Sequence, residues 1–428
     1  MCGTPGASPD IMSRIVLLER ARQVLLIFLL LASCALRAEG RSWRVRPSDN
    51  LPAVVKASAA GDTLRLQSGV YHGDSLRIDH ALTLLGDAGA VLDGGGGGHV
   101  LMVRAHGVTV RGLVLRGAGT SYRSDHAALL AEGVRALVVE NCRFEDNYFG
   151  IYLARCAGAR VKGNTLSSHG ERESSSGNGI HLWHCRQVDI RDNSIQGHRD
   201  GIYLEFGRHL RILGNHSRNN LRYGLHFMFS DSCQYVGNEF DGNGAGVAVM
   251  YSRSVEMRAN HFHDNWGPAS YGVLLKEISD SVIMGNTFTR NTTGLHVEAS
   301  NRLQVGRNRF LRNGWALRLM ANSSQGVYED NVFESNAFDV ATNGRQNDSR
   351  FQRNYWDRHR GYDLDRDGFA DEAYRPVSVF SHVVEDQSPA LVLLRGLFVD
   401  LLDAAERAFP LLTPTSLQDT RPLMRSPL

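Results

Sequence analysis

The sequence predicts an all-β fold, a right-handed parallel β-helix built from coils of ~22–23 residues, with an N-terminal cap and a C-terminal amphipathic helical tail. One observation behind this is an asparagine that recurs every 22 or 23 residues, with two longer intervals of 29 and 26 residues. The other is that each unit holds short β-rich runs separated by Gly and Asn, without a helical period. We expect these asparagines to form a ladder along one corner: Asn141, Asn164, Asn193, Asn215, Asn238, Asn260, Asn286, Asn308, Asn331 and Asn354.

A glycine opens the most regular run of each unit, and we expect it to supply the backbone freedom that starts the next strand. The first and third residues after this glycine are apolar, so strand alternation predicts that they fill the coil interior. The second and fourth residues must then face outward. The glycines are Gly150, Gly179, Gly201, Gly224, Gly246, Gly272 and Gly294.

The outward positions carry aromatic, His and Met side chains, whereas a solvated sheet usually carries Ser, Thr, Lys and Glu. This composition predicts a surface for a partner or ligand, with a face of no function as the alternative. The outward pairs are Tyr152 and Ala154, His181 and Trp183, Tyr203 and Glu205, His226 and Met228, Ala248 and Met250, Leu274 and Lys276, His296 and Glu298, and Arg318 and Met320.

Residues 1–38 are predicted to be a signal peptide, which would direct the mature protein to export. Three arginines precede an apolar run from Val24 to Ala32, and Ala38 offers a small residue for cleavage. The run is too short to predict a membrane span. Leu31 to Cys34 also fits a lipoprotein box, so a lipid anchor at Cys34 is the second interpretation.

The charge balance argues against nucleic acid as a partner. The chain carries 47 Lys and Arg against 45 Asp and Glu, and residues 1–38 hold four of the former and two of the latter. The mature chain is therefore neutral, whereas nucleic-acid binding needs a basic surface.

Residues 39–356 are expected to form the β-helix, with a short helix over 51–60 capping its open edge. Two inserts, 168–176 and 267–270, interrupt the coils, and inserts of a solenoid often line its working face. Cys156 and Cys185 each lie six residues after their glycine, so they stack and could form a disulfide. The alternative is that both thiols simply fill the interior.

Residues 357–388 contain an Asp-rich loop and a terminal coil. The carboxylates of this loop match positions 1, 3, 5 and 9 of a calcium-binding loop, with Gly368 at position 6. Position 12 is Tyr374 rather than Glu and no helix pattern flanks the loop, so we do not expect an EF-hand. We expect a structural Ca²⁺ that stabilises this end, with an Asp-rich turn as the alternative. The candidate ligands are Asp363, Asp365, Asp367 and Asp371.

Residues 389–428 are predicted to form an amphipathic helix, Pro389 to Phe409, followed by a Pro-broken tail. The apolar stripe of the helix is wider than a cap needs. It either plugs the last coil or docks on another protein or a membrane. The residues expected to dock are Leu394, Leu397, Phe398, Leu401, Leu402 and Phe409.

An exported β-helix first suggests a polysaccharide lyase, hydrolase or epimerase, which needs an acid–base pair close together. Glu205 and Lys276 are three coils apart, on the order of 14 Å. Lys276 and Glu298 are adjacent and would neutralise each other. We therefore predict that the protein is not an enzyme, and keep a carbohydrate-binding or carbohydrate-processing protein as the alternative.

Another group of residues suits copper. Met228 and Met250 occupy the same outward column in adjacent coils, with His226 two residues along the strand. Thioethers and imidazole are ligands for Cu(I), which makes transient Cu(I) binding a hypothesis. His181 and His296 could extend the site. The alternative is that the methionines form a contact patch for a protein.

These residues also carry a resemblance to a known family. The runs 200–205, 218–230 and 243–252 resemble NosD, the periplasmic β-helix subunit of ABC transporter complexes for nitrous oxide reductase maturation. So do the runs 269–281, 361–365 and 389–391. The similarity covers about residues 40–425 and is more specific than a generic Asn-Gly repeat.

The resemblance implies a role in denitrification. NosD-like subunits act with a membrane permease and a cytoplasmic ATPase to supply or assemble the copper centres of nitrous oxide reductase, and they receive copper from a lipoprotein chaperone. The chain would be associated with the inner membrane through these partners, and its C-terminal helix would dock on the permease. The copper or partner face would comprise His226, Met228, Met250, His181, Trp183, Tyr203, Glu205, Lys276 and His296.

Overall fold

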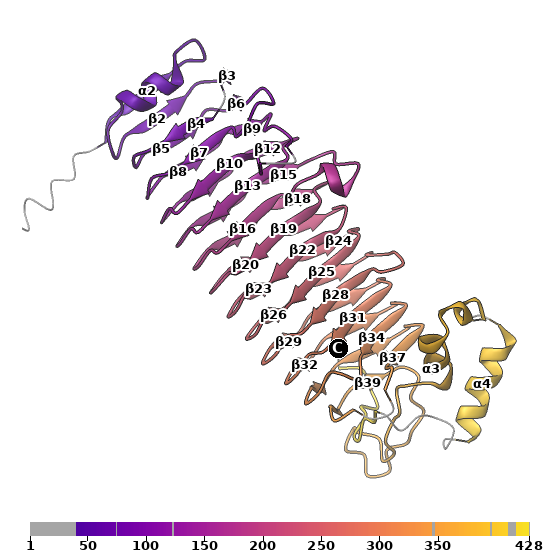
Figure 1. Ribbon diagram of the computed structural model, residues 1–428. Coiled ribbons are helices and arrows are strands. Elements are labelled where there is room, and N and C mark those ends of the chain that lie inside the picture. Colours follow the sequence, from indigo (N-terminus) through magenta and orange to yellow (C-terminus); the bar gives the residue numbers. More distant parts are fainter. Residues whose placement is uncertain are drawn as a thin grey trace, which may run out of the picture.

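The computed structural model describes residues 40–73, 75–121, 124–344, 347–393, 396–409 and 417–427. It forms one long solenoid, with a short helix at the N-terminal end and a pair of helices beside the C-terminal end (Figure 1). The predicted signal peptide, residues 1–38, and with it Cys34, lies outside the described residues. Among the described helices, none is long and apolar enough to cross a membrane.

The coils stack as a right-handed parallel β-solenoid, which confirms the predicted fold class. Each regular coil contributes one strand to each of three parallel sheets, here named A, B and C. Sheet A comprises β1 (Ser42–Val45), β2 (Thr63–Leu66), β5 (Thr83–Gly86), β8 (Thr109–Arg111), β11 (Val138–Glu140), β14 (Arg160–Lys162), β17 (Asp189–Arg191), β20 (Arg211–Leu213), β23 (Gln234–Val236), β26 (Glu256–Arg258), β29 (Val282–Met284), β32 (Gln304–Gly306), β35 (Val327–Glu329) and β38 (Arg350–Gln352).

The other two sheets follow the same order along the chain. Sheet B comprises β3 (Gly69–His72), β6 (Ala90–Asp93), β9 (Val114–Arg116), β12 (Arg143–Glu145), β15 (Thr165–Ser167), β18 (Ser194–Gln196), β21 (His216–Arg218), β24 (Glu239–Asp241), β27 (His261–His263), β30 (Thr287–Thr289), β33 (Arg309–Leu311), β36 (Val332–Glu334) and β39 (Tyr355–Trp356). Sheet C comprises β4 (Leu76–Ile78), β7 (Leu101–Val103), β10 (Ala127–Glu132), β13 (Phe149–Ala154), β16 (Ile180–Trp183), β19 (Asp200–Glu205), β22 (Tyr223–Met228), β25 (Ala245–Met250), β28 (Tyr271–Lys276), β31 (Thr293–Glu298), β34 (Trp315–Leu319) and β37 (Phe338–Ala341).

The core runs through the middle of the coils, because each strand turns alternate residues inward. The constant coil length places like residues above one another, and aromatic rings stack with centroids 4.1 to 5.5 Å apart. Full burial of one such side chain contributes about 1.5–3 kcal/mol, so the stack is a main source of stability. This stack comprises Phe240, Phe262, Phe288, Phe310, Phe333 and Trp356.

The predicted asparagine ladder is present from Asn164 to Asn354. In each step the backbone N–H and the side-chain amide of one asparagine donate to the side-chain oxygen of the next, as between Asn193 and Asn215 at 3.1 and 2.9 Å. Asn141 does not belong to it, because the register places Cys142 opposite Asn164 and the N–H of Cys142 donates to that amide. The sequence analysis also missed a second ladder at another corner: Asn220, Asn243, Asn265, Asn291, Asn313 and Asn336.

The repeat glycines allow the backbones of neighbouring coils to approach closely, and they do not adopt an unusual backbone conformation. None of the seven has a positive φ. A Cβ on Gly246 would lie 2.4 Å from the carbonyl oxygen of Gly272, and one on Gly201 would lie 2.7 Å from that of Gly224. The expectation of backbone freedom was therefore wrong, and a larger side chain would force the coils apart.

The N-terminal cap is the helix α2 (Leu51–Ala57), close to the predicted range. The side chain of Asn50 accepts a hydrogen bond from the N–H of Ala53 and so caps the helix. Leu51 and Val55 turn inward and join the core, which covers the apolar edge of the first coil.

The C-terminal segment differs from the single helix predicted over 389–409. The structure has α3 (Val379–Asp386), a 3₁₀ helix (Ser388–Leu393) and α4 (Leu397–Ala408). Gly396 is extended, with φ −93° and ψ 154°, so the chain breaks before α4 begins. The sequence analysis missed α3, whose N-terminus is capped by the side chain of Ser378.

Among the described residues, the end of the chain and not a helix covers the last coil, which argues against the alternative in which the predicted helix plugs it. Leu417 and Val377 join the core, and Asp419 and Leu423 pair with Phe351 and Tyr355 of the last strands. The helices α3 and α4 instead pack beside sheet C.

The predicted pair of cysteines is not a disulfide. Cys156 and Cys185 are free and buried, and each thiol donates to a backbone carbonyl of a preceding coil. The structure agrees with the alternative that both fill the interior. A hydrogen bond with the thiol of Cys156, together with burial, raises the pKa of Cys185 well above that of an ordinary thiol.

Candidate functional site

The outward face of sheet C contains two side-chain columns in the predicted register. Parallel pairing places Met228 of β22 directly opposite Met250 of β25, about one 4.8 Å strand spacing away. The inner column comprises Tyr152, His181, Tyr203, His226, Ala248, Leu274, His296 and Arg318. The outer column comprises Ala154, Trp183, Glu205, Met228, Met250, Lys276 and Glu298.

The inner column is far less accessible than its outward direction suggested. The rings of Tyr152, His181 and Tyr203 stack with centroids 4.4 and 4.7 Å apart, and Tyr203 meets His226 edge-on at 4.9 Å. The side chains therefore cover one another, and only 7% of His226 is exposed. Burial lowers the pKa of His181 to about 3, so this ring is neutral at ordinary pH.

An ion pair at the start of β19 supports His226. The carboxylate of Asp200 is fully buried and accepts two hydrogen bonds from the guanidinium of Arg222, at 2.9 and 2.5 Å. Burial alone would raise the pKa of Asp200, but hydrogen bonds to His226 and Arg222 outweigh it and lower the pKa. The sequence analysis missed both residues. The sequence does place an Asp and an Arg one coil length apart, and other coils carry different residue types at these two positions.

His226 has one nitrogen held by this pair and one nitrogen without a partner. Its Nδ1 lies 3.1 Å from the guanidinium of Arg222 and 3.6 Å from Oδ2 of Asp200. Its Nε2 is buried and has no hydrogen-bond partner within the described part of the chain. A guanidinium can only donate, so Nδ1 accepts a hydrogen bond from Arg222 and Nε2 carries the proton of the neutral ring. Nε2 binds a metal only in the other tautomer, in which Nδ1–H faces Asp200 at 3.6 Å.

These donors fit Cu(I). The thioether of Met228 is 3.9 Å from the hydroxyl of Tyr203, and that of Met250 belongs to the next rung of the same column. A buried imidazole nitrogen that lacks a partner, together with two neighbouring thioethers, is a donor set suited to Cu(I). The register places His226, Met228 and Met250 on two adjacent strands of one outward face.

The other predicted face residues lie further along the sheet. His181 is two rungs from His226, and His296 is three rungs away, beyond Ala248 and Leu274. Three rungs correspond to about 14 Å, too far for one ion. Burial lowers the pKa of His296 to about 4. Lys276 and Glu298 form an ion pair at 3.2 Å, as predicted.

A row of exposed aromatic rings borders the outer column, and the sequence analysis missed it. His184, Phe206, Phe229 and Tyr251 stack with centroids 4.5 to 5.3 Å apart, and we call this row the aromatic edge. All four have a φ near +50°, a region that costs bulky residues energy. Arg155, Glu277 and Ala299 have the same φ at the same turn of other coils, so the conformation belongs to the coil, and the exposure of the rings is what sets this row apart.

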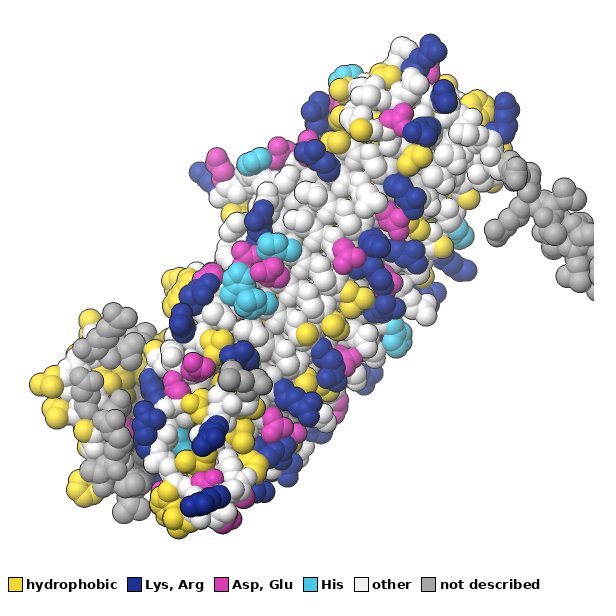
Figure 2. Space-filling view, turned by 180° about the vertical axis from the view of Figure 1, so that it is seen from behind, with side chains coloured by type: hydrophobic (Ala, Val, Ile, Leu, Met, Phe, Trp, Pro, Cys, Tyr) yellow, Lys and Arg dark blue, Asp and Glu magenta, His cyan; other side chains and the backbone are white. Residues whose placement is uncertain are grey.

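Sheet B carries a separate cluster of His and acidic residues (Figure 2). Glu239 lies on β24, and His261 and His263 lie on β27. One potential ligand atom from each of the three lies within 4.8 Å of the others. The alternating burial along β27 turns both histidines outward.

The Asp-rich loop brings together only part of its predicted ligand set. Carboxylate oxygens of Asp363, Asp365 and Asp367 lie within 4.8 Å of one another, and Asp371 instead accepts the N–H of Leu364. Asp367 also forms an ion pair with Arg421 at 2.8 Å.

The C-terminal helices expose much of the predicted docking set. Leu402 packs with Val399 against the small core around Phe338 and Phe380. The outer side of α4 exposes Leu397, Phe398, Leu401 and Phe409, with Leu397 74% exposed. Leu394 lies outside the described residues.

The fold defines the class: an elongated parallel β-helix. Two solved structures share the fold at low identity: the Dettilon tailspike protein (TM-score 0.55, 12% identity, covering 71% of this chain and 69% of that one) and a DFA-IIIase from Arthrobacter chlorophenolicus (TM-score 0.52, 14% identity, 68% and 94%). Such likeness concerns the fold alone.

The sequence relatives are more specific. The model of the family described as periplasmic copper-binding protein (NosD) matches residues 167–364. A probable ABC transporter binding protein NosD of Pseudomonas aeruginosa is 31% identical over 422 residues, covering 94% of this chain and 95% of the relative. One of the same description from Stutzerimonas stutzeri is 27% identical over 383 residues, covering 85% and 87%. The chain belongs to the NosD family.

Proposed function

We propose that the protein is a periplasmic accessory subunit of an ABC transporter complex that supports copper-centre assembly in nitrous oxide reductase. Membership of the NosD family supports the periplasm, copper and a transporter partner. The observation that carries the copper role is the buried, unpartnered Nε2 of His226 beside two thioethers in register.

Copper is cargo in this proposal. His226, Met228 and Met250 would hold Cu(I), because soft thioethers and a neutral imidazole favour that ion. For Nε2 to hold the ion, the ring would take the tautomer whose Nδ1–H turns from Arg222 toward Asp200, 3.6 Å away, an arrangement common behind metal-bound histidines. Arg222 would hold the carboxylate in place for this task.

Cu(I) binding by the purified protein under anaerobic reducing conditions tests this role. We expect Met228→Leu/Met250→Leu to weaken binding at least tenfold, because the swaps keep bulk but remove sulfur. Met284→Leu on sheet A is the matched control and should bind like the wild type. Equal affinity in all three proteins would exclude the thioether site.

We propose that partners dock at two surfaces. The aromatic edge and the outer column would meet the copper chaperone lipoprotein and the reductase, since exposed rings beside methionines suit protein contacts. The exposed side of α4 would dock on the membrane permease and so keep the chain at the inner membrane. ATP hydrolysis would take place in the cytoplasmic ATPase.

Co-purification with the permease tests the second surface. We expect Leu397→Ser/Phe398→Ser/Leu401→Ser to abolish co-purification while the melting temperature stays within a few degrees, because these side chains face solvent. Leu364→Ser, an exposed leucine in the Asp-rich loop, is the control. Retained co-purification of the triple variant would reject α4 as the docking element.

We propose that this role is not enzymatic. The ion pair between Lys276 and Glu298 neutralises the two residues that were the nearest candidates for acid–base work on sheet C. The competing function is that of a carbohydrate-processing protein. Turnover of an acidic polysaccharide that Glu205→Gln abolishes would reverse that choice.

A further inference from the structure

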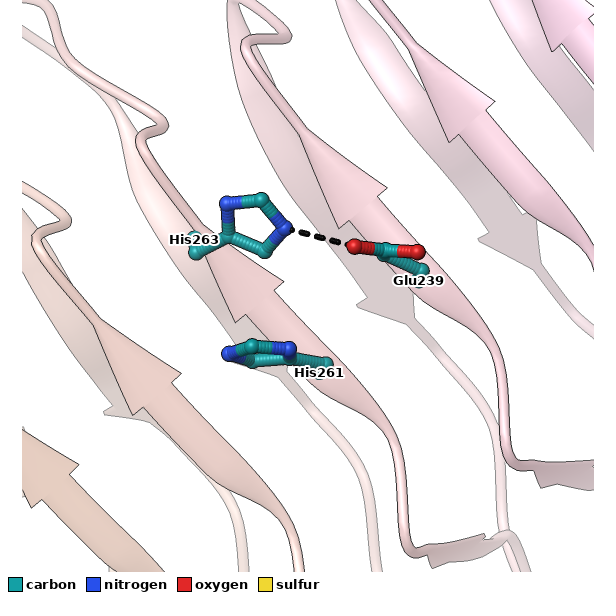
Figure 3. Close-up of side chains that lie close together, drawn as sticks. All are labelled: Glu239, His261 and His263. Atoms are coloured by element: carbon teal, nitrogen blue, oxygen red, sulfur yellow. Dashed lines mark hydrogen bonds and ion pairs between the residues drawn. The ribbon is translucent and has the colours of Figure 1, made fainter.

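The cluster of Glu239, His261 and His263 lies on a different sheet from the thioethers and has a different chemistry (Figure 3). We propose that these three residues form a second metal site, for a divalent ion of the Cu²⁺ or Zn²⁺ kind. The site stands independently of the Cu(I) proposal, because it shares no residue with it.

The register of sheet B creates the site. Strands β24 and β27 pair so that Glu239 lies directly opposite His261, and His263 lies two residues further along the same face. One ligand atom from each lies within 4.8 Å of the others. Ligand atoms around a tetrahedral Zn²⁺ lie about 3.4 Å apart, so rotamer adjustments of ~1 Å would close the site.

A second layer of side chains orients His263. Its Nε2 lies 2.9 Å from a carboxylate oxygen of Glu239, and its Nδ1 lies 2.9 Å from Asp264. Asp264 is itself held by two hydrogen bonds from Arg290. When Nδ1–H donates to Asp264, Nε2 faces Glu239 with a lone pair, and this carboxylate–histidine arrangement is typical of metal ligands.

A fourth donor lies on the preceding strand. His216 of β21 pairs in register with Glu239, and its Nε2 is 3.9 Å from the Glu239 carboxylate. The same nitrogen lies 2.6 Å from Asp241. His216 could thus complete the site by a rotamer change, and His261 is exposed, so the ion would also be open to water or a partner.

The donor set selects the ion. Two or three imidazoles with a carboxylate suit Cu²⁺ and Zn²⁺, whereas Cu(I) prefers the thioethers of sheet C. The competing explanation is an ion-pair network, in which a protonated His263 bridges Glu239 and Asp264 without a metal. A metal site predicts that the protein binds added Zn²⁺ or Cu²⁺, whereas an ion-pair network predicts no such binding.

Calorimetric titration with Zn²⁺ and electron paramagnetic resonance with Cu²⁺ on the purified protein decide between them. We expect one tightly bound ion per chain and a Cu²⁺ spectrum with coupling to at least two imidazole nitrogens. His261→Ala/His263→Ala should remove both signals. His169→Ala is the matched control, because it removes an exposed His–Asp pair elsewhere.

Asp264→Asn tests the second layer, because it removes no ligand; we expect about tenfold weaker binding. Binding that is equal in wild type and double variant, or absent from both, would overturn the proposal and leave an ion-pair network. The Met228→Leu/Met250→Leu variant should still bind the divalent ion at this site. The experiments can therefore reject the divalent-metal site and the Cu(I) site separately.

Discussion

Asn354 donates both its backbone N–H and its side-chain amide to one carboxylate oxygen of Asp419, at 3.0 and 2.9 Å. The indole N–H of Trp356 donates to the same oxygen at 3.1 Å. A residue from the end of the chain thus supplies the last acceptor of the asparagine ladder, 65 positions beyond it.

We predict that Asp419→Ala destabilises the last coils. It leaves three buried donors without an acceptor, and each such loss costs about 1–3 kcal/mol. Asp419→Asn keeps an acceptor oxygen and should cost less. Urea unfolding and hydrogen exchange of the last coils measure the effect, and equal stability of the two variants would contradict the ladder-ending role.

We predict that Asp200→Asn lowers stability at pH 7 by about 2–3 kcal/mol, because it leaves the half-buried guanidinium of Arg222 without its carboxylate. The folded pKa of Asp200 lies below its usual value, so the stabilisation is present above pH ~4 and is lost as pH falls below that.

Urea unfolding of wild type and Asp200→Asn at pH 7 and pH 3 measures this difference, which should shrink at pH 3. Asp280→Asn, at an exposed pair with Arg302, is the control and should change little at either pH. A difference that stays the same at pH 3 would mean that the charge of Asp200 is not the cause.

We predict that the protein loses stability as pH falls from about 6.5 to about 4, because His296 is buried and neutral. Burial lowers its pKa to about 4, with Arg318 as the next cause. The unfolded chain therefore takes up a proton first, which lowers the free energy of unfolding by up to about 3 kcal/mol. His296→Gln should reduce the pH dependence of the melting temperature without abolishing it, because the buried His181 also has a lowered pKa, and an unchanged slope would contradict the assignment.

We predict that millimolar Ca²⁺ raises the melting temperature through the Asp-rich loop. Asp363, Asp365 and Asp367 supply converging carboxylate oxygens, the ligands that Ca²⁺ prefers. Asp365→Asn should remove the shift, and Mg²⁺ should not reproduce it. If Ca²⁺ leaves the wild-type melting temperature unchanged, the loop is an Asp-rich turn stabilised by its own amides.

Much of the scaffold and part of the site could be predicted from sequence, because period and alternation are local properties. The pairing of Met228 with Met250 followed from the coil length alone. The ion pair of Asp200 and Arg222 could not be read this way, because two isolated residues form no pattern. The cluster of Glu239, His261 and His263 likewise depends on which strands become neighbours on sheet B.

The sequence by itself determined the coil, the direction of each side chain and the membership of the outward columns, since these depend on a repeat length and on strand alternation. Tertiary structure alone decided which outward residues remain accessible. His226 points away from the core and is still buried, because Tyr203 and Tyr223 of neighbouring positions pack against its ring. Tyr203 lies one coil away from His226, so its contribution to this burial exists only after the coils have stacked.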